Sequence, residues 1–319
     1  MKFDVFNGDA DGLCALHQLR LAEPATTTLI TGVKRDIGLL HRIDAQAGDE
    51  ILALDIAVEK NAVPLAAALE KGVKVRWFDH HNPGELPVHP NFQATIDTSA
   101  DTCTSLLVDR HLGGAHRLWA VAAAFGDNLH GAARRAAEPL RLSMAQLDAL
   151  RELGECLNYN GYGDSLEDLH FHPAELYRAL HAYADPFAFI HEAAEFHTLS
   201  TGYVLDMAQA RAISAEDVRP SGAVYILPDT AWARRVSGVY ANDLATAQPQ
   251  RAHALLTRSP KGYYVVSVRA PLVNKTGADE LCRKFETGGG RKAAAGINIL
   301  PEARIPEFVA EFFRAYPGQ

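Results

Sequence analysis

The chain has 319 residues, with 31 Lys and Arg against 39 Asp and Glu, and its formal net charge at pH 7 is −8. With 48% hydrophobic and 22% charged residues, the chain has the composition of an ordinary globular protein, and its length corresponds to about two domains. This composition excludes disorder, collagen-like repeats and a disulfide scaffold as descriptions of the whole chain. The acidic balance argues against a broad basic surface for long nucleic acids.

The cysteines and the N-terminus bear on the cellular compartment. Cys14, Cys103, Cys156 and Cys282 are far apart and form no CxxC pair, which is typical of thiols kept reduced. No run approaches the roughly 18 apolar residues of a membrane helix. Acidic residues near the N-terminus argue against a signal peptide. We therefore expect a cytoplasmic monomer or homodimer with no membrane partner and no disulfide partner.

The first 80 residues alternate between two periodicities. Strands are predicted over 2–6, 27–33, 50–56 and 73–78, and helices over 12–22 and 60–71. Strand and helix repeat with short connections, a pattern that favours a parallel α/β sheet.

The rest of the chain divides into a helical and a β-rich part. Residues 118–212 are rich in Ala, Leu and Glu, and 187–212 is predicted as one long helix or two helices broken near Gly202. Strands are predicted over 223–227, 263–268 and 297–300, and helices over 278–285 and 306–316. We therefore expect an α/β protein with a parallel-sheet domain over 1–195, a helical linker over 196–220 and a smaller α/β domain over 221–319. The active cleft is expected between the two domains.

Acidic and histidine residues follow three of the predicted strands. NGDADG follows the first strand, Asp55 lies at the end of the third, and Asp79-His80-His81 ends the fourth. Because the carboxyl ends of parallel strands form one edge of a sheet, these residues are expected to converge. Carboxylates and neutral imidazole together suit Mn²⁺, with Mg²⁺ or another divalent ion as the alternative.

Each segment by itself has an ordinary structural interpretation. A DxDG pattern is common in turns, a His pair is more often structural, and Asp127 in FGDN could simply end a helix. Their order along one chain is specific, and it resembles the DHH phosphoesterase superfamily, in particular its RecJ-like and nano-RNase-like members. The resemblance implies two Mn²⁺ ions, one held by Asn7, Asp9 and Asp55 and the other by Asp11, Asp55, His80 and Asp127.

The same resemblance assigns catalytic roles to two further residues. Asp79 would orient a histidine or a ligand water, and His81 would face the substrate phosphate and stabilise charge in the transition state. The sequence departs from the family at Asn7, where His or Asp is usual. An Asn offers a carbonyl oxygen without negative charge, so we expect weaker binding of the first ion.

A glycine-rich segment near the C-terminus is the second strong signal. Gly288, Gly289 and Gly290 precede Arg291 and Lys292, and Arg269 stands in SVRAP upstream. Glycines let a backbone approach an anion closely, and the cations add charge, although a flexible turn with surface cations is the alternative. The segment resembles the substrate-binding DHHA1 domain, in which His usually stands at the position of Arg291.

The expected function is hydrolysis of phosphodiester or phosphomonoester bonds by hydroxide activated between two metal ions. The substrate class is small nucleotides or short single-stranded oligonucleotides, which makes the chain exonuclease-like and a binder of nucleic acid. The alternatives are a pyrophosphatase or exopolyphosphatase, and a non-catalytic nucleotide-binding protein with a decayed metal site. Lys34 and Arg35 are further candidates for phosphate contacts, and Tyr159 or Tyr162 for stacking on a base, each with a structural role as an equal alternative.

Overall fold

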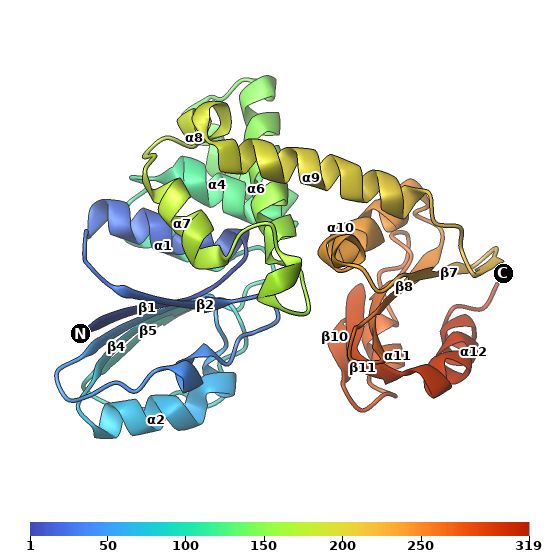
Figure 1. Cartoon of the computed structure of the whole chain (residues 1–319), viewed down its shortest axis with the longest axis horizontal. Helices are drawn as coiled ribbons and strands as arrows, with labels where there is room; N and C mark the ends of the chain where they lie inside the picture. The colour runs from blue at the N-terminus through green and yellow to red at the C-terminus, as the bar shows by residue number, and fades with distance from the viewer. Residues whose placement is uncertain (319) are drawn as a thin grey trace. The chain divides into compact units, whose positions relative to one another are not determined.

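The computed structural model describes residues 1–318. Those residues form two compact units, the first Met1–Thr201 and the second beginning at Gly202. Helix α9 (Ala194–Arg211) belongs to both, because the division falls within it. Each unit has a β-sheet of its own, as the strand labels of Figure 1 show.

The N-terminal sheet is fully parallel, as the alternation of strands and helices predicts. Its five strands lie in the order β2-β1-β3-β4-β5, so the order reverses between β1 and β3. At such a switch point the loops diverge and leave room for a ligand at the carboxyl ends of the strands. The strands are β1 (Lys2–Asn7), β2 (Thr28–Gly32), β3 (Glu50–Leu54), β4 (Lys74–Asp79) and β5 (Phe92–Ile96). Strand β5 was not predicted, because this polar edge strand has no buried residue.

Helices cover both faces of this sheet. Helices α1, α4, α6 and α7 lie on one side and α2 on the other (Figure 1). The core under α2 is formed by apolar residues such as Val5 and Trp77. The helices of the first unit are α1 (Ala10–Ala22), α2 (Ala62–Glu70), α3 (Thr104–His111), α4 (Arg117–Gly126), α5 (His130–Ala137), α6 (Met144–Gly161), α7 (Pro173–His181) and α8 (Pro186–Glu192). Short 3₁₀ helices are η1 (Leu39–Arg42), η2 (Val58–Asn61), η3 (Glu138–Leu140) and η4 (Leu166–Asp168).

Neither alternative for residues 187–212, one long helix or a break near Gly202, is correct, because α8 and α9 are separated at Ala193. The chain leaves the helical conformation at Ala193, whose ψ is 123°, and Gly202 lies within α9. A glycine costs a helix about 1 kcal/mol relative to alanine, which the rest of a long helix readily tolerates. The break was not marked in the sequence, because alanine is the best helix former.

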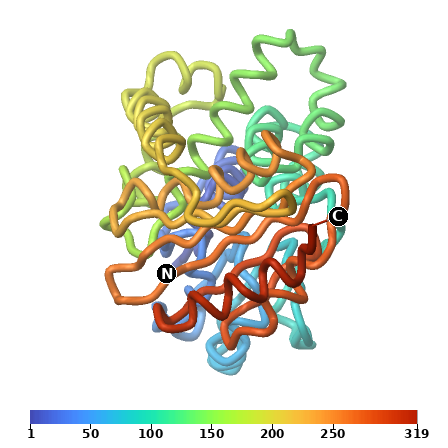
Figure 2. The backbone as a smooth tube through the Cα atoms, turned by 90° about the vertical axis from the view of Figure 1, so that its right-hand side faces the viewer, coloured from blue at the N-terminus to red at the C-terminus, as the bar shows by residue number. Residues whose placement is uncertain are grey.

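The C-terminal unit is a mixed sheet in the order β10-β11-β9-β8-β7-β6. Only β7 and β8 pair in parallel, and α10 connects them. Helix α12 packs on one face through Phe308 and Phe312, and Figure 2 shows it in dark red across the strands. The elements are β6 (Asp217–Arg219), β7 (Gly222–Leu227), α10 (Ala231–Ala247), β8 (Ala252–Arg258), β9 (Tyr263–Arg269), α11 (Ala278–Cys282), β10 (Gly288–Arg291), β11 (Ala294–Pro301), η5 (Glu302–Arg304) and α12 (Ile305–Ala315).

The glycine-rich segment is a strand and not a flexible turn. Residues Gly288–Arg291 form β10, which pairs antiparallel with β11 from Gly288 opposite Ile297 to Arg291 opposite Ala294. Lys292 and Ala293 make the turn between the two strands. The paired residues of β10 and β11 are mostly Gly and Ala. Such residues show no alternation of apolar and polar side chains, so the sequence pattern did not predict a strand here.

Two further observations concern the expected partners and compartment. All four cysteines are buried and free, so the described chain has no disulfide. None of the helices over residues 1–318 combines the length and the apolarity that a membrane crossing requires.

Candidate metal centre

The predicted acidic and histidine residues of the first unit come together at the carboxyl edge of its sheet. Asp9 caps the start of α1 directly after β1, and Asp55 follows β3. His80 follows β4, and Asp127 caps the end of α4. These positions surround the switch point between β1 and β3, where the topology favours ligand binding.

His80 is the centre of this group. Its Nε2 atom lies 3.4 Å from Asp55 Oδ1, 3.7 Å from Asp127 Oδ2 and 4.0 Å from Asp11 Oδ2. Its Nδ1 atom lies 3.1 Å from the carbonyl oxygen of Thr102, a contact that orients the ring with Nε2 toward the carboxylates. Ligand atoms of Asp11, His80 and Asp127 all lie within 4.8 Å of one another. A divalent cation with bonds of about 2 Å fits a set of that size.

Asp55 adopts a left-handed backbone conformation. Its φ is 58°, in the left-handed region that L-residues other than Asn and Asp rarely adopt. The backbone N–H of Asp55 donates to the Phe78 carbonyl oxygen at 3.0 Å, and its side chain is 2% exposed. Burial and the charges of neighbouring carboxylates, Asp11 first among them, raise the pKa of Asp55 well above its usual range. A bound cation would relieve this repulsion.

Asp11 is fixed by the start of α3. The backbone N–H groups of Thr104 and Ser105 each donate to its carboxylate at 2.7 Å. The Thr104 hydroxyl also donates to Asp55 Oδ1 at 3.1 Å. Burial and the charge of Asp127 raise the pKa of Asp11. Thr104 and Ser105 were not identified from the sequence; the only signal was a polar Thr-Cys-Thr-Ser stretch before an apolar helix.

Gly12 is required by the close packing of the DxDG turn. A Cβ atom at this position would lie 2.2 Å from the carbonyl oxygen of Asn7, which is backbone and cannot move aside. The glycine therefore lets α1 begin directly beneath the end of β1, and so brings Asp9 and Asp11 to the same edge.

Asp79 and His81 form a pair at the border of the cluster, and His81 belongs with Asp55 and His80 to a second group whose ligand atoms lie within 4.8 Å of one another. His81 Nδ1 donates to Asp79 Oδ1 at 2.7 Å, and the other carboxylate oxygen of Asp79 is buried without a hydrogen-bond partner. Burial lowers the pKa of His81, but the hydrogen bond and charge of Asp79 outweigh it, and the net pKa is raised. Asp79 therefore orients the imidazole and favours its protonated form, with the side chain of His81 36% exposed.

The residues expected around the first ion are arranged differently. Asp9 Oδ1 accepts from the backbone N–H groups of Asp11 and Gly12, and Asp9 Oδ2 pairs with the ammonium of Lys34. Burial raises the pKa of Asp9, but Lys34 outweighs it and the net pKa is lowered. Asn7 Oδ1 is buried without a hydrogen-bond partner, so it supplies a single neutral oxygen. Over the described residues, Asp11, His80 and Asp127 of the second predicted set have ligand atoms within 4.8 Å of one another, whereas Asp9 of the first set belongs to no such group.

Lys34 and Asn158 also belong to this centre. From the sequence, Lys34 was only a candidate for a phosphate contact, and Asn158 was assigned no role of its own. Lys34 donates to Asp127 Oδ1 at 3.1 Å and to Asn158 Oδ1 at 2.8 Å, as well as to Asp9. Asn158 belongs to the last turn of α6. Tyr159 is buried and its hydroxyl contacts His170 at 2.7 Å, which is the structural alternative and not a base-stacking position.

The predicted substrate residues of the second unit do not share one environment. The side chains of Arg291 and Lys292 are exposed at the end of β10 and in the turn that follows it. Arg269 is partly buried, and its guanidinium donates to Asn242 Oδ1 at 2.6 Å and to the Gly238 carbonyl oxygen at 3.4 Å. Arg269 therefore anchors α10 to β9, whatever else it contacts.

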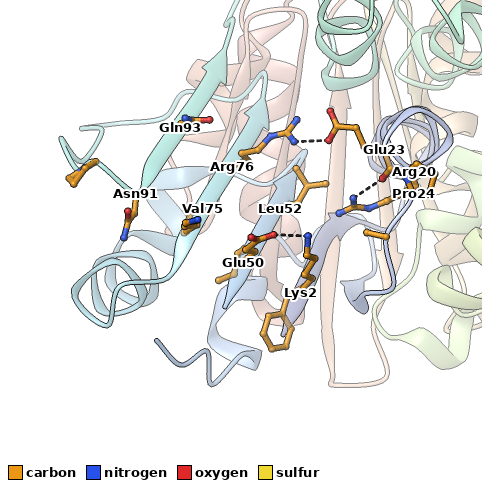
Figure 3. Close-up of a pocket in the computed structure, with 15 residues that line it drawn as sticks. Lys2, Arg20, Glu23, Pro24, Glu50, Leu52, Val75, Arg76, Asn91 and Gln93 are labelled. Atoms are coloured by element: carbon orange, nitrogen blue, oxygen red, sulfur yellow. Dashed lines mark hydrogen bonds and ion pairs between the residues drawn. The ribbon is translucent and has the colours of Figure 1, made fainter. Parts of the chain in front are cut away.

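A cavity of about 540 Å³ lies at the opposite, amino-terminal edge of the first sheet. Figure 3 shows charged side chains paired across it, Lys2 with Glu50 at 2.9 Å and Arg76 with Glu23 at 2.7 Å. Both glutamates of its lining are thus engaged in ion pairs, and the residues of the metal centre do not line it. We therefore place the candidate site at the carboxyl edge.

Comparison with known proteins gives a fold and no close relative. No protein-family model matches the sequence, and no curated protein matches it either. The solved structure of exonuclease RecJ bound to manganese is similar, with a TM-score of 0.64 and 20% identity, over 100% of this chain and 91% of that one.

Two further structures agree. Manganese-bound RecJ from Thermus thermophilus has a TM-score of 0.62 and 22% identity, over 98% of this chain and 51% of that one. The pGpG-specific phosphodiesterase PggH from Vibrio cholerae has a TM-score of 0.57 and 16% identity, over 98% of both chains. The chain therefore has the fold of these RecJ and phosphodiesterase structures, with a parallel N-terminal sheet, a helical middle and a mixed C-terminal sheet.

Proposed function

We propose that the chain is a divalent-metal-dependent phosphoesterase that acts on small nucleotides or short single-stranded oligonucleotides. The observation that carries the proposal is the convergence of Asp11, Asp55 and Asp127 on His80 Nε2, within 4.0 Å in each case. Exonuclease RecJ and a pGpG-specific phosphodiesterase have the same fold, so phosphoesters of nucleotides are the substrates to test.

The chain's own residues divide the work. Asp11, Asp55, His80 and Asp127 would hold the cation, since the three carboxylates lie within 4.0 Å of His80 Nε2. When bound, such a cation withdraws charge from a phosphoryl oxygen and favours the ionisation of water. Thr104 fixes Asp55 by a hydrogen bond, and the start of α3 fixes Asp11. These two ligands are therefore held in position by the protein itself and do not depend on the cation. A preorganised site of this kind loses little free energy to reorganisation during the reaction.

His81 is placed to handle charge and protons. Since Asp79 accepts the hydrogen bond from Nδ1, the Nε2–H of a protonated His81 is the group that can face a phosphoryl oxygen. The imidazolium would stabilise negative charge as it develops, or donate its proton to the leaving oxygen. The raised pKa of His81 supports this role, because it keeps the ring protonated to a higher pH.

The second unit is proposed to hold the rest of the substrate. Arg291 is an exposed cation at the end of β10, the glycine strand, and Lys292 is exposed in the turn that follows. An Arg side chain can bind a phosphate with two hydrogen bonds. A net charge of −8 supports a short substrate, because a long nucleic acid needs many phosphate contacts along a basic surface.

The test is release of phosphate or mononucleotide from a panel of substrates with added Mn²⁺. The panel holds linear dinucleotides, short RNA and DNA, a nucleoside 3′,5′-bisphosphate and pyrophosphate. We expect the wild type to turn over one nucleotide class. Turnover should fall at least a hundredfold in His80→Ala and should be unchanged in the control His191→Ala. His191 is exposed on α8 and contributes nothing to the cluster. Turnover that survives in His80→Ala would contradict the proposal, and turnover of pyrophosphate alone would replace the substrate class.

A second candidate function is nucleotide binding without hydrolysis. The pairing of Asp9 with Lys34 favours it, because a carboxylate that the family motif assigns to metal is engaged by a lysine. Tight binding of a dinucleotide by the wild type, with no turnover of any substrate in the presence of Mn²⁺, would establish this second function.

A further inference from the structure

The ammonium of Lys34 occupies a position formed by three oxygens. Its Nζ atom donates to Asp9 Oδ2, to Asp127 Oδ1 at 3.1 Å and to Asn158 Oδ1 at 2.8 Å. A lysine ammonium has three N–H donors and no acceptor, so these three partners satisfy it completely. The partners come from the start of α1, the end of α4 and the end of α6, three elements far apart in the sequence.

The rest of Lys34 is fixed as well. Its backbone N–H donates to the Gly161 carbonyl oxygen at 2.8 Å, which ties the residue after β2 to the end of α6. Its Nζ atom lies 5.6 Å from the centre of the Tyr162 ring, within the range of a cation–π interaction. The side chain is only 22% exposed. Lys34 is therefore a built part of the centre and not a mobile surface lysine.

Lys34 also changes what Asp9 can bind. Both carboxylate oxygens of Asp9 are engaged, Oδ1 by two backbone N–H groups and Oδ2 by Lys34. Lys34 therefore competes with a metal ion for Asp9 Oδ2, and without Asp9 the set expected around a first ion is a neutral Asn7 oxygen and a share of Asp55. Ions such as Mn²⁺ and Mg²⁺ bind through several charged oxygens, so this set would bind a divalent ion weakly. The Lys34 ammonium supplies the positive charge that is paired with the Asp9 carboxylate.

We propose that the Lys34 ammonium takes the place of one of the two divalent ions, so that each chain binds a single divalent ion, at Asp11, Asp55, His80 and Asp127. The inference rests on the proposed function only in assigning that ion to phosphoester hydrolysis. Lys34 is a positioning residue: it holds Asp9 and Asp127 in place and supplies a fixed positive charge beside the ion.

The test counts Mn²⁺ bound per full-length chain by equilibrium dialysis and elemental analysis, with electron paramagnetic resonance to detect coupled pairs of ions. We expect one Mn²⁺ and an uncoupled spectrum for the wild type, and none for His80→Ala. Two ions in the wild type, with a coupled spectrum, would overturn the inference even if no variant folds.

The variants test the role of the charge itself. Lys34→Met removes the ammonium and keeps the length of the side chain, and Asn7→Asp adds a carboxylate beside it. We expect the double variant to bind two Mn²⁺ with a coupled spectrum. The matched control is Lys71→Met, since Lys71 is an exposed lysine whose partner Asp44 is also exposed, at 3.0 Å. It should bind one ion, like the wild type.

The outcomes separate this inference from the proposed function. One ion in the wild type and two in a folded Lys34→Met, Asn7→Asp double variant would support the inference, whether or not any substrate is hydrolysed. One ion in that folded double variant would show that Lys34 excludes nothing, and the inference would fail. Failure of the proposed function has a different signature, because the wild type would then bind its ion and hydrolyse no member of the panel.

Discussion

Ser105 donates two hydrogen bonds to Asp11, one from its backbone to the Asp11 side chain and one from its side chain to the Asp11 backbone. The Ser105 N–H donates to Asp11 Oδ1 at 2.7 Å, and the Ser105 hydroxyl donates to the backbone carbonyl oxygen of Asp11 at 2.8 Å. Both groups are buried. The start of α3 is thereby fixed to the DxDG turn, although the two residues are 94 positions apart.

Ser105→Ala is predicted to loosen this connection. It removes the hydroxyl donor and keeps the backbone bond, and the loss of one buried hydrogen bond costs about 1 kcal/mol. We expect the free energy of unfolding, measured by urea denaturation, to fall by that amount. Ser99→Ala is the control, because its hydroxyl bonds to Asp97 at an exposed site. Equal effects of the two variants would contradict the structural role of Ser105.

Asp79→Asn is predicted to act on catalysis through His81. In the wild type Asp79 raises the pKa of His81, so the protonated ring is lost only as the pH rises through that raised value. Without the charge, the pKa of His81 falls. The alkaline limb of the pH–rate profile should therefore shift to lower pH, and kcat should drop about a hundredfold.

The measurement is a pH–rate profile on the substrate that the panel identifies, with Mn²⁺ binding determined in parallel. Mn²⁺ binding should change little, since Asp79 is not among the residues around the ion. Asp148→Asn, on an exposed surface of α6, is the control. An unshifted alkaline limb in Asp79→Asn would remove His81 from the proposed mechanism.

Gly12→Ala and Gly131→Ala are predicted to have opposite effects. The new Cβ at position 12 would lie 2.2 Å from the Asn7 carbonyl oxygen, whereas at position 131 the nearest atom is the end of the Arg135 side chain at 3.5 Å. We expect Gly12→Ala to lower the free energy of unfolding by about 1–3 kcal/mol. Gly131→Ala, within α5, should raise it by about 0.5–1 kcal/mol. Thermal or urea unfolding measures both, and a neutral Gly12→Ala would refute the close packing of the turn.

Arg291→Ala is predicted to weaken substrate binding. Arg291 is exposed at the end of β10, so its loss should leave the stability of the second unit unchanged. A hydrogen bond to a charged group contributes about 1.5–3 kcal/mol, so we expect KM to rise about tenfold or more with little change in kcat. Arg283→Ala is the control, because Arg283 is exposed and pairs with Asp279 at 3.1 Å. Steady-state kinetics that leave KM unchanged in Arg291→Ala would remove the glycine strand from the substrate site.

Much of the fold followed from local patterns. The parallel strands β1 to β4 and helix α1 are predicted from their apolar segments, and the residues at the carboxyl ends of the strands were predicted to converge because parallel strands share one edge. Asp11, Asp55, His80 and Asp127 do converge there. Strand β5 was not predicted because it has no buried residue and so lacks that signal.

The identity of the cation beside Asp9 was decided by the tertiary structure alone. The sequence placed Asp9 in a metal motif and left Lys34 as one of several cations after a strand. Only the packing of α1, α4 and α6 brings Asp9, Asp127 and Asn158 around the same ammonium. A sequence pattern determines which chemical groups lie at one edge of a sheet. Which groups satisfy one another there depends on distances of a few ångströms between segments that are far apart in the chain.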